Sequence, residues 1–418
     1  MHAWDGYKRV AWGRDEMRPV SGTAHDFFVP GRTFGLSIVE ALDTLYVMEL
    51  DDEVARATRW ILDFLDFDVD ADVQMFEIVI RMLGGLLAAY HATHEARLLA
   101  LARDLGDRLL PCFTKSPTGA PYRYVNLRTG AVREAKMNLA EIGSNVLEFG
   151  ELSRLTGDPK YLGASLRAYE AVISQRSPLD LLGTYFDVET GTFASPEDVA
   201  PNDPADSFYE YLWGGWAMLG RAQCRDWFHA LTDALLAHSA ERADGRLWFA
   251  TVDYRTGEKL GHTQSELAAF FAEILAKGGY ASEGAAYYDA FTAVRRRYEI
   301  LPEGFDYRTL EVTADRGNSL RPEYVNAAFD LWFLTHDRKY RDTAYDYFDA
   351  FRRHCRVANG YTIATDVTTR PMALGDLFPA YAFSENFKYL YLMFAEPARF
   401  DGANYYLNTE GKILRGLR

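Results

Sequence analysis

The chain has few cysteines, no long apolar run and no concentration of positive charge. Its three cysteines, Cys112, Cys224 and Cys355, form no CxxC pair, so there is neither a disulfide framework nor a zinc ligand set, although one disulfide is possible. Without 18 consecutive apolar residues, no segment is expected to span a membrane. The formal net charge of −15 and the lack of a Lys/Arg-rich run argue against nucleic acid or an anionic membrane as partner.

Motifs of several enzyme classes are also missing. The sequence contains no HExxH, GxSxG, P-loop or GxGxxG, so zinc proteases, serine hydrolases and nucleotide-binding enzymes have no support. An acidic chain suits a neutral substrate or a cationic metal. The 26 Tyr, 26 Phe and 8 Trp residues offer rings with a flat face and a polar edge, which suit sugar binding, although most are expected to fill the core.

No signal peptide is evident, and the chain opens almost directly on HAWDGYKRVAWGRDE, as though a segment had been removed. We therefore expect a secreted or periplasmic protein, and the Ala/Arg-rich character favours a bacterial source. With 418 residues, 48% of them hydrophobic, the chain can bury a large core. We expect one catalytic domain over residues 1–418 and a monomer.

Apolar periodicity predicts fourteen helices. They lie at residues 3–12, 33–49, 51–67, 76–91, 94–108, 139–156, 159–175, 205–220, 223–240, 262–276, 281–298, 321–335, 338–353 and 379–395. Every second helix carries an acid in or near its first turns, followed by an apolar or aromatic run. These acids are Asp43, Glu77, Glu141, Asp206, Glu266, Glu323 and Glu385.

A recurring helix pair indicates a repeat architecture, either an open solenoid or a toroid of inner and outer helices. One or two such acids could serve only the helix dipole. Seven of them in register favour closure, with a ring of carboxylates at one mouth of a barrel. Three connections into inner helices, YVNLRTGAV, YFDVETGTF and TVDYRTGEKL, predict β-hairpins at that end.

Glu77 and Arg81 interrupt the apolar run MFEIVIRMLGGLLAAY at an i, i+4 spacing that predicts an ion pair. A purely structural pair at the rim of a core helix is one interpretation. Because burying charges is costly, a functional pair is the other. A carboxylate ring suits glycoside hydrolysis, which needs an acid and a base or nucleophile, and it also suits a hard cation such as calcium.

The motifs resemble glycoside hydrolase family 47, the class I α-1,2-mannosidases, over essentially the whole chain. In order they are AWDGYKRVAWGRDEMRPVSG, LSIVEALDTLYVMEL, FEIVIRMLGGLLAAYH, LAEIGSNVLEFGELSRLTGD, DSFYEYLWGGW, LRPEYVNAAFDLWFLTHDRKYRD, ENFKYLYLMF and LNTEG. The resemblance implies an all-α (α/α)7 barrel with a C-terminal segment entering it, a bound calcium ion and an inverting exo-mannosidase.

The resemblance also implies roles for individual residues. Glu77 matches the proposed general acid, with Arg81 beside it, and Asp206 matches a second active-site carboxylate that could instead be the proton donor. Glu323 matches the proposed general base, with Arg321 beside it. The matches to other residues that line the pocket or contact substrate are Glu141, Glu210, Tyr381 and Glu385. Thr409 matches the direct calcium ligand, through its hydroxyl and carbonyl, and Glu323, Glu385 and Glu410 would reach the ion through water.

Four positions depart from the family pattern. Asn326 replaces a usual second Glu, and NTEGK, with Gly411 and Lys412, replaces NTEAH. HTQSELAAFF lacks a common acid–histidine pair, and Pro204 stands where some members have an arginine facing the glycan. These changes leave the water network around calcium and the branch preference open.

We therefore expect a calcium-dependent inverting exo-α-1,2-mannosidase acting on N-glycan-like oligosaccharides or mannobiosides. Since Glu77 and Glu323 fall on the second and sixth of seven inner helices, they are expected to face each other with room for a water, as inversion requires. A catalytically weak, lectin-like member of the same fold is the alternative, and a solenoid scaffold for proteins is a third.

Overall fold

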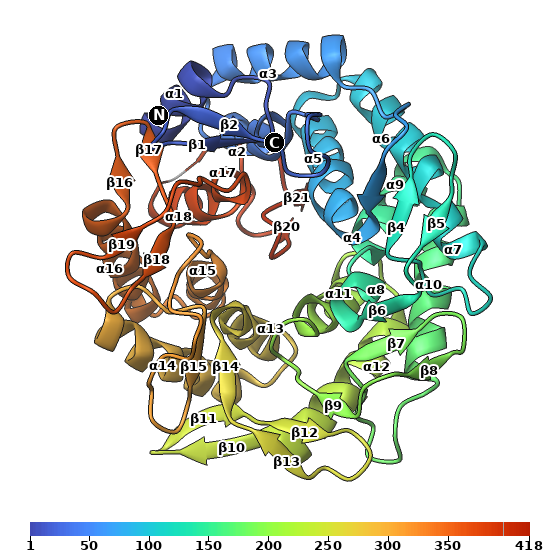
Figure 1. Cartoon of the computed structure of the whole chain (residues 1–418), viewed down its shortest axis with the longest axis vertical. Helices are drawn as coiled ribbons and strands as arrows, with labels where there is room; N and C mark the ends of the chain where they lie inside the picture. The colour runs from blue at the N-terminus through green and yellow to red at the C-terminus, as the bar shows by residue number, and fades with distance from the viewer. Residues whose placement is uncertain (396) are drawn as a thin grey trace. The chain divides into compact units, whose positions relative to one another are not determined.

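The computed structural model describes residues 1–395 and 397–418. The chain divides into two compact units. Unit 1 comprises Met1–Leu65, Ala243–Leu247 and Thr263–Arg418, and unit 2 comprises Asp66–Arg242 and Trp248–His262. Both units are mainly helical with short antiparallel strands (Figure 1). The expectation of one catalytic domain over residues 1–418 stays a prediction.

Unit 1 contains helices from both ends of the sequence. They are α1 (His2–Val10), α2 (Leu36–Val47), α3 (Asp51–Phe64), α13 (Phe271–Lys277) with the preceding 3-10 turn Glu266–Phe270, α14 (Ala281–Tyr298), α15 (Glu323–Thr335), α16 (Arg338–His354), α17 (Tyr381–Ser384) and α18 (Asn386–Phe394). Its strands are β1 (Glu16–Arg18), β2 (Thr23–His25), β14 (Thr263–Ser265), β15 (Gly304–Asp306), β16 (Arg356–Val357), β17 (Gly360–Tyr361), β18 (Ala364–Asp366), β19 (Ala373–Leu374), β20 (Tyr406–Leu407) and β21 (Ile413–Arg415).

Unit 2 repeats the same plan with helices from the middle of the chain. They are α4 (Met75–Ile78), the π turn Val79–Leu83, α5 (Gly84–Thr93), α6 (Ala96–Leu109), α7 (Pro111–Thr114), α8 (Leu139–Gly143), α9 (Val146–Thr156), α10 (Lys160–Ile173), α11 (Asp206–Ala217) and α12 (Ala222–Ala234) with the π turn Leu235–Ser239. Its strands are β3 (Asp72–Gln74), β4 (Tyr124–Asn126), β5 (Val132–Arg133), β6 (Lys136–Asn138), β7 (Tyr185–Asp187), β8 (Thr192–Phe193), β9 (Glu197–Asp198), β12 (Thr251–Asp253) and β13 (Lys259–Gly261). β10 (Ala240–Ala243) and β11 (Arg246–Phe249) lie where the chain passes between units.

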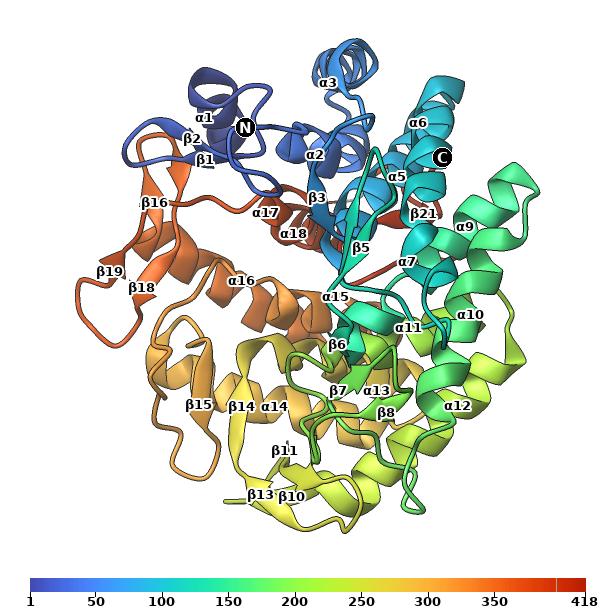
Figure 2. The ribbon, with the colours of Figure 1, turned by 45° about the vertical axis from the view of Figure 1, so that its right-hand side comes forward.

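Helices pack in pairs within each unit, as the repeat predicted. In unit 1, α2 packs on α3, α13 on α14 and α15 on α16, while α17 packs against α2 and α18 against α15 (Figures 1 and 2). In unit 2, α5 packs on α6, α9 on α10 and α11 on α12, and the acid-bearing helices contact one another. All but one of the twelve residues of α2 are buried, whereas α3 buries only Ala57 and Ile61. The acid-bearing helices are therefore the inner ones of each pair.

Three inner helices predicted to be continuous are interrupted. The prediction at 139–156 breaks at Ser144 and Asn145, where the Asn145 Nδ2 donates to the Ile142 carbonyl at 2.6 Å. The prediction at 379–395 breaks at Glu385, and a π turn lies inside the helix predicted at 76–91. Apolar periodicity did not reveal these breaks because the residues on both sides of each are buried.

The three Thr-Gly hairpins are confirmed as β4–β5, β7–β8 and β12–β13. In each hairpin one side-chain oxygen accepts two backbone N–H bonds from the turn, and the acceptors are Asn126, Asp187 and Asp253. A fourth turn of this kind, held by Asp306, was missed because Leu310, at φ 58°, stands where the others have glycine.

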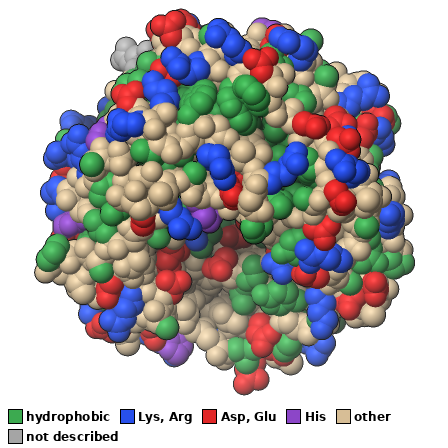
Figure 3. Space-filling view, turned by 45° about the horizontal axis from the view of Figure 1, so that its top comes forward, with side chains coloured by type: hydrophobic (Ala, Val, Ile, Leu, Met, Phe, Trp, Pro, Cys, Tyr) green, Lys and Arg blue, Asp and Glu red, His purple; other side chains and the backbone are tan. Residues whose placement is uncertain are grey.

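One helical run meets a test for membrane-spanning helices that uses length and mean hydropathy, although Glu77 and Arg81 interrupt its apolar residues. Met75–Thr93 is long and apolar enough, by length and composition, to cross a membrane, although 72% of the relevant window is buried inside the protein, as expected for a core helix. The three cysteines are all free and buried, so the possible disulfide is not formed. The face seen in Figure 3 mixes basic and acidic side chains.

Candidate active site

The predicted ion pair in unit 2 is confirmed. The Arg81 Nε donates to the Glu77 Oε2 at 2.7 Å. The pair straddles the start of the π turn, and both side chains keep some exposure, 23% for Glu77 and 13% for Arg81. A π turn inside an α-helix frequently marks a functional site. The carboxylate is therefore held in place by the guanidinium but not sealed from solvent.

Glu141 is held by three groups from different elements of unit 2. Asn138 caps α8 by accepting the Glu141 backbone N–H at 2.8 Å, while Gln74 and Arg123 reach its carboxylate at 2.6 and 2.8 Å. Burial raises the pKa of Glu141, and the Arg123 guanidinium opposes this shift. Sequence reasoning missed Gln74, the last residue of β3, and Arg123, which immediately precedes β4, since no motif marks either residue.

Asp206 begins α11, where its Oδ1 accepts the neighbouring Ser207 N–H at 2.9 Å. Glu210 lies one turn later and is 2% exposed. The Ser144 hydroxyl donates to the Ser207 hydroxyl at 2.8 Å, so the break between α8 and α9 is tied to the start of α11. Within unit 2, α8 packs against both α4 and α11, which makes the helices that carry Glu77, Glu141 and Asp206 neighbours.

In unit 1, Glu323 is the first residue of α15 and lies close to Glu266. Burial raises the pKa of Glu323, and the Arg321 guanidinium opposes this shift. Burial, together with the Glu323 and Glu303 carboxylates, raises the pKa of Glu266 well above its usual range. One Glu323 oxygen, Oε2, is buried without a hydrogen-bond partner among the described residues.

Arg321 was predicted beside Glu323, and its strongest bonds go to a residue that sequence reasoning missed. Its Nε donates to both oxygens of Glu303, at 3.0 and 3.2 Å, and Glu303 also accepts the Ser319 N–H at 2.7 Å. No motif led to Glu303, because it lies in a connection between helices. Arg321 is thus held in place by Glu303, while its positive charge opposes the rise in the pKa of Glu323.

Tyr381, the first residue of α17, is surrounded by these charged groups. Its hydroxyl donates to the Ser319 carbonyl, and the Arg321 guanidinium lies 6.0 Å from the ring centroid. Burial raises its pKa well above the usual range, and nearby Glu303, Glu323 and Glu385 add to the shift. The structure therefore brings four predicted site residues of unit 1, Arg321, Glu323, Tyr381 and Glu385, into one cluster.

Residues 408–412 form a loop between β20 and β21. The Thr409 hydroxyl donates to the Asn326 Oδ1 at 3.0 Å, and its carbonyl accepts from the Tyr389 hydroxyl at 2.8 Å. The Glu410 carbonyl accepts from the Ser384 hydroxyl at 3.0 Å, which places the loop beside Glu385.

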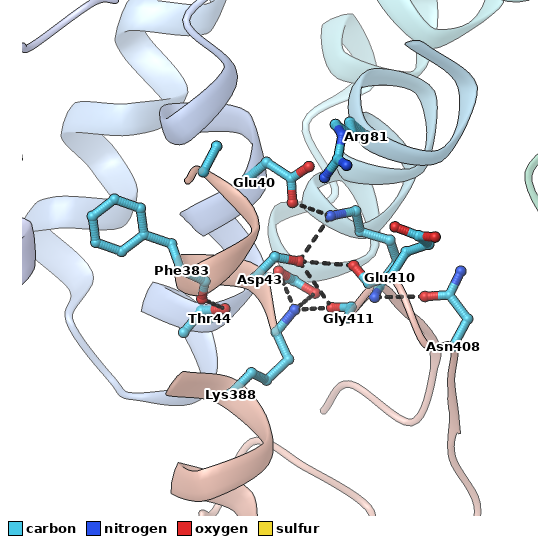
Figure 4. Close-up of polar contacts among 12 residues, drawn as sticks. Glu40, Asp43, Thr44, Arg81, Phe383, Lys388, Asn408, Glu410 and Gly411 are labelled. Carbon is cyan, nitrogen blue, oxygen red and sulfur yellow. Dashed lines mark hydrogen bonds and ion pairs between the residues drawn. The ribbon is translucent and has the colours of Figure 1, made fainter. Parts of the chain in front are cut away.

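Two buried lysines, Lys388 on α18 and Lys412 within the loop itself, tie this loop to α2, and sequence reasoning missed the role of Lys388 (Figure 4). The Lys388 Nζ lies 2.7 Å from both oxygens of Asp43 and donates to the Gly411 carbonyl. The Lys412 Nζ pairs with Glu40 and donates to the Ser384 hydroxyl at 2.7 Å. Asp43, one of the seven predicted inner acids, is therefore the partner of a buried lysine.

The oxygen atoms of Thr409 could bind calcium, provided that water or substrate supplies most of the other ligands. Thr409 offers two neutral oxygens, and calcium takes oxygen ligands in flexible geometry. Among residues 1–395 and 397–418, no group of three or more His, Cys, Asp or Glu side chains could hold a metal directly. An ion at Thr409 would thus depend on water and on the hydroxyl groups of a bound sugar, with Glu323, Glu385 and Glu410 as candidates to hold the water.

Comparisons with known proteins identify the family of the chain. The family model described as glycosyl hydrolase family 47 matches residues 1–416. Mannosyl-oligosaccharide 1,2-alpha-mannosidase IB of Mus musculus is 32% identical over 100% of this chain and 68% of its own length. Mannosyl-oligosaccharide 1,2-alpha-mannosidase MNS1 of Arabidopsis thaliana is 32% identical over 99% and 77%. The solved alpha-1,2-mannosidase from Trichoderma reesei is similar with a TM-score of 0.90, at 26% identity, over 100% of this chain and 97% of that one.

Proposed function

Because the chain belongs to glycosyl hydrolase family 47, we propose that it is a calcium-dependent, inverting exo-α-1,2-mannosidase that releases terminal mannose from N-glycan-like oligosaccharides or mannobiosides. The names of its relatives and the likeness to the Trichoderma reesei enzyme over the whole chain support the linkage and the sugar. The same likeness supports a closed (α/α)7 barrel. The observation that carries the catalytic part is the buried Glu323 Oε2, which has no hydrogen-bond partner within residues 1–395 and 397–418.

Glu323 is the proposed general base. Its Oε2 can accept a proton from the attacking water because no donor among the described residues occupies it. The Arg321 guanidinium favours the carboxylate form against the effect of burial, and Glu303 holds Arg321 in place. A base must be ionised to act, and Arg321 is the neighbour that favours this form, whereas burial and the Glu303 carboxylate raise the pKa of Glu323.

Glu77 is the proposed source of the proton for the leaving oxygen, with Asp206 as the other candidate. The Arg81 bond uses the Glu77 Oε2 and fixes the rotamer, which leaves Oε1 to deliver a proton directly or through a water. When bound at Thr409, calcium supplies positive charge that orients the sugar hydroxyls and polarises a nearby water. Tyr381 offers a ring face to the sugar, with its hydroxyl anchored to Ser319.

Hydrolysis of α-1,2-mannobiose, followed by proton NMR before mutarotation, tests this function. We expect β-mannose as the first product, α-1,3-mannobiose as a poor substrate, and loss of turnover in excess EGTA that calcium restores. An α-anomer appearing first would overturn inversion, and full activity after verified metal removal would overturn calcium dependence. Binding without turnover would instead favour the lectin-like alternative.

A further inference from the structure

One face of α15 connects the Thr409 hydroxyl to a buried ion cluster in unit 1. The Thr409 hydroxyl donates to the Asn326 Oδ1 at 3.0 Å, and the Asn326 Nδ2 donates to the Asp330 Oδ2 at 3.4 Å. Glu323, Asn326 and Asp330 are spaced three and four residues apart, so all three lie on the same side of the helix. Asn326 is 1% exposed and Asp330 is fully buried.

Asp330 is fixed from its far side. The Lys277 Nζ lies 2.9 Å from the Asp330 Oδ2 and 2.6 Å from Glu273, and the Tyr405 hydroxyl donates to the Asp330 Oδ1 at 2.8 Å. The carboxylate is thus paired with a cation and bonded on both oxygens. Its position is set by Lys277 and Tyr405 as well as by Asn326.

This arrangement decides the direction of the hydrogen bonds. An ionised carboxylate only accepts, so the Asn326 amide must turn its NH2 toward Asp330 and its carbonyl toward Thr409. The Thr409 hydroxyl must then donate to Asn326, which directs its lone pairs elsewhere. An acid at position 326 would instead place a second negative charge beside Asp330, which is unfavourable in a buried site.

We propose that Asn326, oriented by Asp330, is a positioning residue that holds the Thr409 hydroxyl as an acceptor for the calcium ion. This inference rests on the proposed calcium site and adds a determinant of its affinity. In this role Asn326 acts through the Thr409 hydroxyl and needs no contact of its own with the metal or the sugar. It acts by removing the rotational freedom of the Thr409 hydroxyl, so that the acceptor is already oriented when the cation arrives.

Calcium titration of Asn326→Leu tests the proposal without relying on activity. After removal of metal with EGTA, calcium chloride is added back, and the Kd is taken from the calcium-dependent rise in Tm and by calorimetry. A single hydrogen bond is worth about 0.5–1.5 kcal/mol, so we expect the Kd to rise up to about tenfold. The kcat at saturating calcium should fall much less than the calcium affinity.

Asn145→Leu is the matched control. Asn145 is another buried amide, in unit 2, with one bond to a backbone carbonyl, so its loss should lower the metal-free Tm but leave the calcium Kd unchanged. An unchanged Kd in Asn326→Leu, or an equal rise in both variants, would overturn the positioning role alone. A wild-type protein that calcium neither binds nor stabilises would overturn the calcium proposal and this inference together.

Discussion

Replacing Lys388 with methionine should show how much the buried ion pair beneath the 408–412 loop matters. Lys388 is fully buried and Asp43 is 2% exposed, so the variant leaves a carboxylate inside the protein with the Ile413 N–H, at 3.2 Å, as a remaining donor. Breaking a buried pair in this way costs about 3–5 kcal/mol. With an unfolding entropy of about 0.9 kcal/mol per kelvin for 418 residues, the Tm should fall by about 3–6 °C.

The double variant Asp43→Leu/Lys388→Met should recover much of that loss. Burial lowers the pKa of Lys388 to about 8 even though Asp43 opposes the shift, which indicates that the pair does not fully offset the cost of burying its charges. Replacing both partners by apolar groups removes that cost, and the bonds to the Ile413 N–H and the Gly411 carbonyl are lost with it.

Calorimetry in EGTA separates this effect from calcium binding. Lys339→Met is the control, because its pair with Asp289 is exposed and should change the Tm by less than about 1 °C. A Lys388→Met protein as stable as the wild type, or a double variant no more stable than the single one, would refute the reasoning.

Three further predictions concern pH, the ion pair in unit 2 and the proposed base. Burial raises the pKa of Asp198 to about 7, against about 3.9 in the unfolded chain. The contribution of this group to the free energy of unfolding is therefore fully present below pH 4, and about 4 kcal/mol of it is lost as the pH rises through 7. Urea unfolding of Asp198→Asn should therefore depend less on pH over that range, and an identical slope would contradict the assignment. Arg81→Met should lower kcat/KM by about 10–100-fold, the value of one charged hydrogen bond, with partial rescue in Arg81→Lys; unchanged kinetics would make the pair with Glu77 structural. Glu323→Gln should bind mannobiose, but its kcat should fall by about 10²–10⁴-fold. Near-normal turnover would indicate that Asp206 is the general base instead.

Local features of the sequence predicted local features of the structure. The Glu77–Arg81 bond followed from an i, i+4 spacing, and the hairpins followed from Thr-Gly turns. The helix pairs followed from apolar periodicity and repeat length. In each case the information lies within a few residues, or in a pattern that recurs along the chain.

Contacts between distant segments could not be predicted in the same way. Arg123 contacts Glu141 from the segment before β4, and Thr409 contacts Asn326 across 83 residues. No sequence pattern predicts either contact, because both depend on how helices and loops pack in the folded protein. The roles of Glu77, Asp206 and Glu323 rest on family likeness and stay predictions.

The composition of unit 1 from both ends of the chain has a consequence for synthesis. Asp43 leaves the ribosome 345 residues before Lys388, which at about 5–20 residues per second is a delay of about 20–70 seconds. During that time α2, almost wholly buried in the finished protein, lacks α17 and α18 as packing partners, while the residues of unit 2 are already complete. Residues 1–65 therefore wait longer for their packing partners than the residues of unit 2 do, and truncation before α17 should leave the apolar surface of α2 uncovered and prone to aggregation.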